Sequence, residues 1–414
     1  MLPQTQGSET NIKLPISFIF ISLLALVLSQ IILLINGHML IGGSFRIPPV
    51  WSSAHLLVLG WALMAAMGAM YQLVPVAFLT KIWNEKFGFI QFFITAAGIL
   101  TFSGMLYWAP QKALIPGILT LLGILMFLFQ MVMTLRMQAK PNILTAFVGT
   151  ALFCLFFTIF MGITLIFCLK TGFAANYYQS IFKTHILMGV TGWFTLLIFG
   201  FSYKMVPMFS LSHGFPMIHA RFVYGTYVSG LALTAISFFT ENSILLKIGF
   251  FLLLVGFSIF SWHISIIIKK RLKKKLDKPF TFAIIAIGLG NLIHLAVFIV
   301  LWSKHFSTIV GPIVYAYILL WIVLSIVGYL YKIVPFLWWT YKYSKEIGKA
   351  KVPSLKEMMD EKIVVPLFTT FIIAVLLVFC SITFKLAILF NIGQFILSIV
   401  FIIIAISIVR VIKK

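Results

Sequence analysis

A four-residue pattern of Trp, Gly, Tyr and Pro, here called the frame, occurs three times in this chain of 414 residues with the same internal spacing. The copies are Trp61-Gly68-Tyr71-Pro75, Trp193-Gly200-Tyr203-Pro207 and Trp321-Gly328-Tyr331-Pro335. They begin 132 and 128 residues apart, and similarity at a long fixed period is typical of internal repeats. At about 100° per residue, the four positions lie on one face of a helix. The sequence therefore predicts three copies of one helical unit.

Composition places these units in a membrane. The chain is 62% hydrophobic and has only eight acidic residues, which excludes a soluble protein. Stretches long enough to span a bilayer lie near residues 14–36, 53–79, 88–108, 113–135, 143–169, 182–209, 221–240, 243–268, 280–302, 309–339, 363–384 and 386–409. We predict an all-α polytopic fold in a single membrane domain over residues 1–414. Its twelve transmembrane helices form three pseudo-threefold repeats of four, at about 14–140, 141–276 and 277–410, with the frame on the second helix of each.

Basic residues predict the orientation. With a cytoplasmic amino terminus, 24 of the 31 Lys and Arg face inside, which follows the positive-inside rule. The other seven face outside: Arg46, Lys112, Lys170, Lys183, Lys247, Lys304 and Lys385. We expect a multi-pass protein of the plasma membrane with both termini in the cytoplasm. The net charge of +23 indicates contact with anionic membrane lipid rather than with nucleic acid.

The ionisable residues inside the predicted spans are mainly histidines. All eight acids lie in predicted loops or at termini, which disfavours a transporter coupled to protons or cations, because such carriers keep intramembrane carboxylates. Neutral imidazole is the commonest side-chain metal ligand. We therefore look for chemistry in the histidines of the outer half, which are His38, His55, His185, His294 and His305.

Two of these histidines form the main candidate site. His55 lies six residues before Trp61, and His185 lies eight residues before Trp193, so on one helical template they point about 160° apart. On neighbouring repeats around a threefold axis, such positions can converge on a shared pocket. Two opposed imidazoles at matching depth indicate a six-coordinate heme, with His55 and His185 as the ligands of its iron. His294 and His38 are weaker candidate metal ligands, because a lone intramembrane His is more often a helix contact.

The remaining motifs have structural interpretations. The Trp, Gly and Tyr of each frame are expected to pack the central helices, with Gly permitting close approach. Lys204 and Lys332 precede the frame prolines by three residues and are expected to snorkel to water. The three cysteines have no metal-ligand spacing, and we expect no copper site. No catalytic residue can be assigned.

The stretches from His55 through Pro75 and from His185 through Pro207 resemble a helix of subunit I of the heme-copper oxidases, particularly the C-type oxidases and the nitric oxide reductase large subunit. In that family the tenth helix carries two His separated by one residue, followed by Gly-Trp, Gly, Tyr and Pro at this spacing. The resemblance implies twelve helices in three arcs of four. His55 matches the second His of the family's pair, which serves a low-spin heme, and His185 matches the first.

The chain also departs from that family. Ile313 and Tyr315 stand where the tenth helix should carry its two His, and no adjacent His pair for copper occurs on the seventh helix. Only Lys385 is found where the family has an Arg pair for the heme propionates. The resemblance therefore implies a divergent member that lacks a complete binuclear center, and reduction of oxygen or nitric oxide is not expected.

The expected function is that of a heme-binding integral membrane protein. One bis-His, low-spin, b-type heme would lie between the second and sixth helices near the outer face. A saturated iron leaves no position for a substrate, which favours electron transfer or heme or gas sensing with an electron donor or respiratory-chain partner. Two alternatives stay open: an accessory or assembly protein for heme, copper or the nitric oxide response, and a transporter on an oxidase-like scaffold.

Overall fold

The computed structural model describes residues 10–414 and is 84% helical, with no strand in the described part. Twelve of its helical segments are long and apolar enough to cross a membrane, which confirms the predicted all-α polytopic fold. These segments are Lys13–Gly42, Pro48–Phe78, Glu85–Trp108, Leu114–Arg136, Ile143–Thr171, Ala175–Ser210, Ile218–Thr240, Ser243–Lys269, Lys278–Val300, Phe306–Glu346, Glu361–Phe384 and Ala387–Lys413. The sixth and tenth extend several residues beyond the predicted hydrophobic runs.

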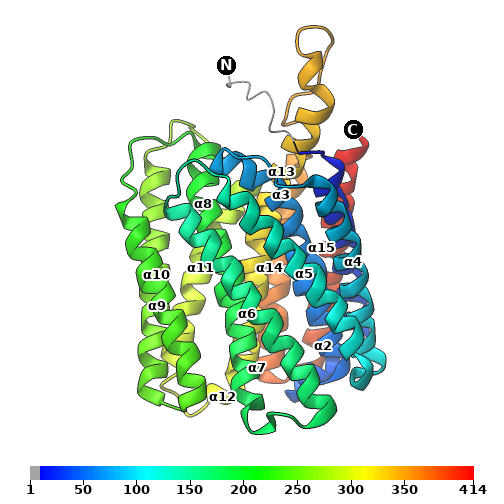
Figure 1. Cartoon of the computed structure of the whole chain (residues 1–414), viewed down its shortest axis with the longest axis vertical. Coiled ribbons are helices and arrows are strands. Elements are labelled where there is room, and N and C mark those ends of the chain that lie inside the picture. Colours follow the sequence, from blue (N-terminus) through cyan, green and yellow to red (C-terminus); the bar gives the residue numbers. More distant parts are fainter. Residues whose placement is uncertain (1–9) are drawn as a thin grey trace.

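The α-helices of the chain run roughly parallel to one another (Figure 1). They are α1 (Lys13–Asn36), α2 (Pro48–His55), α3 (Met64–Phe78), α4 (Glu85–Trp108), α5 (Leu114–Arg136), α6 (Ile143–Thr171), α7 (Tyr178–Ile186), α8 (Thr195–Ser210), α9 (Ile218–Thr240), α10 (Ser243–Lys269), α11 (Lys278–Val300), α12 (Phe306–Ala316), α13 (Leu324–Tyr343), α14 (Glu361–Phe384) and α15 (Ala387–Lys413). Short 3-10 segments include η1 (Gly37–Gly42) after α1 and η3 (Pro110–Lys112) before α5.

Three of the spans contain a π-helical segment, and each segment carries the Trp of a frame. They are η2 (Leu56–Leu63), η5 (Leu187–Phe194) and η6 (Tyr317–Val323). Trp61, Trp193 and Trp321 are at most 1% exposed. The expectation of one uniform α-helix through each frame is therefore wrong at the frame Trp, where the wider π-helical turn changes which residues share a face. π-helical turns are rare and occur frequently at functional sites.

The frame glycines allow close helix packing. A Cβ atom added at Gly68 would lie 2.8 Å from the carbonyl oxygen of Pro15 in α1. At Gly200 the added atom would lie 3.0 Å from a side chain of α6, and at Gly328 it would lie 2.9 Å from a side chain of α11. At Gly68 and Gly328 the frame helix thus approaches the preceding span too closely for a Cβ atom, and at Gly200 the neighbouring side chain would have to shift. This confirms the packing role expected for these glycines.

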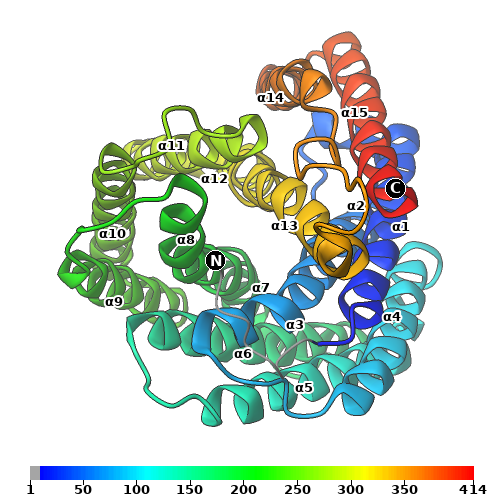
Figure 2. The ribbon, with the colours of Figure 1, turned by 90° about the horizontal axis from the view of Figure 1, so that it is seen from above.

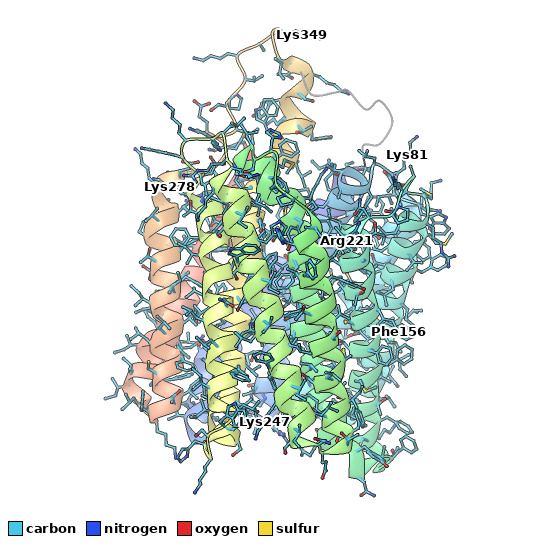
Figure 3. The ribbon with its side chains drawn as sticks, turned by 90° about the vertical axis from the view of Figure 1, so that its left-hand side faces the viewer. Lys81, Phe156, Arg221, Lys247, Lys278 and Lys349 are labelled. Carbon is cyan, nitrogen blue, oxygen red and sulfur yellow. The ribbon has the colours of Figure 1, made fainter. Side chains whose placement is uncertain are left out.

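The first and the last described helices pack against each other. Seen from above, the helices surround the central α3, α8 and α13, and α15 packs against α1 (Figure 2). The start of α1 and the end of α15 lie at one end of the bundle (Figure 1). Lys81, Lys278 and Lys349 lie at that end, and Lys247 lies at the other (Figure 3). The described residues therefore form one multi-pass helical bundle.

Lys332, which is partly exposed as expected, also has a partner that its spacing did not predict. The ammonium of Lys332 does not simply reach water but pairs with the carboxylate of Asp277 at 2.5 Å, and Lys273 contacts the other carboxylate oxygen at 2.6 Å. Asp277 directly precedes α11 and is only 9% exposed. This ion pair joins α13 to the residue before α11, a contact between residues that lie far apart in the sequence.

Candidate functional site

The structure brings His55 and His185 together. His55 is the last residue of α2, directly before η2, and His185 lies one residue before the end of α7, which η5 follows. The centroids of the two imidazole rings are 6.3 Å apart, and the ring planes differ by 26°. The two residues come from the second and sixth spans, so the convergence expected from their different spacing to Trp is present in the fold.

On each of the two helices, aromatic residues one or two turns before the histidine lie on the same face as the histidine. Pro48 starts α2 after an extended Ile47, and Trp51 and His55 then line one cavity together. On α7, Tyr178 and Phe182 line the cavity with His185, at intervals of four and three residues. Each helix therefore contributes one imidazole and, one or two turns before it, aromatic residues of the cavity wall.

Hydrogen bonds determine which nitrogen of each imidazole is free. Nδ1 of His55 lies 2.7 Å from the carbonyl oxygen of Trp51, and Nδ1 of His185 lies 2.9 Å from the carbonyl oxygen of Thr158 in α6. A carbonyl oxygen only accepts, so both Nδ1 atoms donate and both Nε2 atoms carry a lone pair. Within residues 10–414, neither Nε2 has a hydrogen-bond partner, and neither is sealed off by protein atoms. Metal-ligating histidines are held in the same way.

Both rings line a cavity between α2, α4, α5, α6 and α7. Its empty space is about 780 Å³, a figure that includes the open solvent at its mouth. The walls are mostly aliphatic and aromatic, with Leu59, Phe102 and Ile159 among them, and no acidic or basic side chain other than the two histidines lines the cavity. The cavity therefore suits a large apolar ligand that is bound through the imidazoles.

Two contacts fix the orientation of the rings. A Cβ atom added at Gly162 of α6 would lie 3.0 Å from Cε1 of His185, so glycine lets that ring lie against the α6 backbone. The ring of Phe102 from α4 stands edge-on to His55, with centroids 5.4 Å apart and planes at 88°. Both imidazoles are thus positioned by packing as well as by hydrogen bonds.

The donor set fits a heme better than a free metal ion. A metal–nitrogen bond takes about 2 Å on each side, so a metal between the two rings would separate their centroids by just over about 6 Å. The observed separation is 6.3 Å. Among the described residues there is no group of three or more His, Cys, Asp or Glu that could hold a metal. A porphyrin supplies four nitrogen ligands itself and needs only two from the protein.

The other candidate ligands lie elsewhere. His38 is exposed in η1 and does not line the cavity. His294 is buried in α11, where its Nδ1 donates to the carbonyl oxygen of Gly290 at 2.8 Å and its Nε2 lies 3.4 Å from the hydroxyl of Tyr227. Its ring packs on Phe257, with centroids 4.3 Å apart. The structure does not bring either residue to the pair of His55 and His185.

Sequence reasoning missed Thr158 and Gly162. Both belong to α6, and each acts through the neighbouring His185, one as a hydrogen-bond acceptor and the other by leaving space. No local pattern in α6 indicates either role. By contrast, the acceptor for His55 is Trp51, one helical turn earlier, and this i−4 relation is readable from the sequence.

Comparison of the chain with protein-family models and with curated proteins finds no match.

Proposed function

We propose that this chain is an integral membrane protein that binds one b-type heme between α2 and α7, with His55 and His185 as the axial ligands. One observation carries the proposal. Both imidazoles donate through Nδ1 to backbone carbonyls, have no hydrogen-bond partner at Nε2 among the described residues, and line the same apolar cavity, with ring centroids 6.3 Å apart. The function that follows is electron transfer, or sensing of heme or a gas, rather than turnover of a substrate.

The residues of the chain hold and tune this site. The carbonyl oxygens of Trp51 and Thr158 keep the imidazoles in the tautomer that can bind iron, and they raise the basicity of Nε2. The apolar walls exclude water from the space around the ligand. A bound heme supplies a reversible one-electron couple. If His55 and His185 both bound its iron, no coordination position would be left for a substrate.

The wider proposal concerns the organisation of the chain. Three features support three related four-helix units: the recurring frame, a π-helical segment at each frame Trp, and a frame glycine packed on the preceding helix. We place the protein in the plasma membrane with cytoplasmic termini, as a divergent relative of heme-copper oxidase subunit I that lacks a complete binuclear center. The distribution of Lys and Arg supports this orientation. For electron transfer, the proposed partner is an electron donor or a component of the respiratory chain.

An absorption spectrum of the detergent-purified protein, oxidised and dithionite-reduced, with pyridine hemochrome quantification, tests the proposal. We expect about one heme per chain and a sharp reduced α band. His55→Ala and His185→Ala should each abolish the low-spin spectrum. His38→Ala and His305→Ala remove exposed imidazoles outside the cavity and should leave it unchanged.

Two results would change the assignment. A full heme complement in both His55→Ala and His185→Ala would refute these ligands. Heme lost on mild washing, or copper found by elemental analysis, would favour an accessory protein that carries a cofactor without using it.

A further inference from the structure

The cavity has an uncharged lining, but a cation lies beside its wall. The guanidinium carbon of Arg46 lies 4.6 Å from the ring centroid of Phe182, which lines the cavity. One guanidinium nitrogen donates to the side chain of Gln179 at 2.9 Å. Arg46 precedes α2 and is exposed, so its charge stays in water while the apolar part of the cavity begins next to it.

The spacing along α7 shows how far this cation lies from the imidazoles. Phe182 is three residues before His185, and Tyr178 is seven residues before it, which correspond to about 4.5 and about 10 Å along a helix axis. All three residues line the cavity. The cavity therefore extends outward from the histidine pair along α7, toward the end of the helix where Arg46 sits.

Arg46 has no acidic partner in the described part of the chain. The ion pairs found within residues 10–414 both involve Asp277, which precedes α11 and would lie on the cytoplasmic side. The only acid in a predicted outer loop is Glu241, which follows α9. A guanidinium has five N–H donors in a fork that matches a carboxylate, and the bond to Gln179 occupies one of its nitrogens. The other N–H donors of Arg46 can therefore bind an acidic group of a ligand.

We infer that Arg46 binds a carboxylate of the ligand in this cavity, at the end that Tyr178 also lines. This inference rests on the proposed function. A heme has one apolar edge and one edge with two propionates, and burying the acidic edge in the uncharged part of the cavity would be costly. Arg46 therefore sets the rotation of the ligand, with the acidic edge directed outward, and acts as a positioning residue for the cofactor.

The test compares hemin with hemin dimethyl ester, whose carboxylates are blocked. Each compound is titrated into wild-type protein and Arg46→Gln, both expressed under heme limitation and purified in detergent. For each protein, the preference is the dissociation constant of the ester divided by that of hemin. We expect this ratio to be about 5- to 30-fold larger for wild-type protein than for Arg46→Gln. The ester partitions into detergent more than hemin does, but it does so equally with both proteins. Comparing the ratio for wild-type protein with the ratio for Arg46→Gln therefore removes this effect.

The control is Lys183→Gln. Lys183 is an outer cation on α7, the helix that carries Phe182 and His185. Its ammonium lies 5.7 Å from the ring centroid of Phe238 in α9. Lys183→Gln should keep the wild-type preference. If Arg46→Gln keeps it as well, the role of Arg46 is overturned while heme binding stands. If neither compound gives a low-spin spectrum with wild-type protein, the proposed function fails and the inference fails with it.

Discussion

The imidazole ring of His185 lies against Gly162, so that a Cβ atom added at this glycine would come within 3.0 Å of Cε1 and 3.3 Å of Nδ1. The same ring donates from Nδ1 to the carbonyl oxygen of Thr158, one turn earlier in α6. The α6 backbone therefore holds the imidazole on two sides. A larger residue at position 162 must push the ring out of place.

Gly162→Val should abolish the low-spin spectrum, and Gly162→Ala should weaken hemin binding by roughly tenfold, because the added atoms displace the ring from its acceptor. Hemin titration followed by absorption measures both effects. Gly149→Ala and Gly149→Val are matched controls, because Gly149 lies in the same helix with open space at its Cβ position. Wild-type binding by Gly162→Val would show that the ring position does not depend on this glycine.

Thr195→Val should destabilise the fold by about 1–3 kcal/mol, because it leaves buried donors without an acceptor. The hydroxyl of Thr195 lies 2.7 Å from the hydroxyl of Tyr317 and accepts a hydrogen bond from Nε1 of Trp321 at 3.0 Å. All three side chains are buried. Thermal unfolding in detergent measures the change. Thr164→Val, which removes a hydroxyl that bonds within α6, should have little effect, and equal destabilisation by both variants would contradict the prediction.

Asp277→Asn should lower stability by about 1–3 kcal/mol at neutral pH, because it leaves the ammonium of Lys332 without its carboxylate. Burial alone would raise the pKa of Asp277, but hydrogen bonds and charges from Lys273 and Lys332 outweigh it and hold the pKa below its usual value of 3.8. The folded state thus favours the ionised form. This stabilisation is complete above about pH 3.8 and is lost as the pH falls through the folded pKa.

The free energy of unfolding of wild-type protein and of Asp277→Asn is measured across acidic pH. The difference between the two free energies should become smaller below pH 3.8. Lys332→Met should remove part of the effect of Asp277→Asn in a double-mutant cycle. Lys204→Met, at the equivalent position of the second frame, should not. A difference between wild-type protein and Asp277→Asn that grows toward low pH would contradict the ion-pair account.

Gly68→Ala should destabilise the bundle by about 1–3 kcal/mol, because the new Cβ atom would lie 2.8 Å from a backbone oxygen of α1, which cannot move aside alone. Gly104→Ala is the control, since Gly104 lies in α4 with nothing within 4 Å of its Cβ position. That substitution should be neutral or slightly stabilising, because alanine favours helix. Midpoints of thermal unfolding compare the two variants, and equal midpoints would show that α1 can adjust.

The twelve helices and the close packing at the frame glycines can be predicted from local sequence. Membrane insertion depends on the summed hydrophobicity of about 20 consecutive residues, and this sum is local in the sequence. Trp61 and Gly68 lie on one span, so their shared role also follows from spacing alone. The position of His55 relative to Trp61 indicated an approach to His185, although this required the assumption that repeats surround an axis.

Tertiary structure alone decided the rest. The acceptor at Thr158, the space at Gly162 and the partner of Lys332 all come from helices or loops that lie far away in the sequence. The π-helical turns also lie where the central spans pack, and no residue pattern predicts them. Hydrophobicity determines that a segment enters the membrane, but inside it every helix is apolar. Which faces meet is therefore decided by shape complementarity and by a few polar contacts between distant segments.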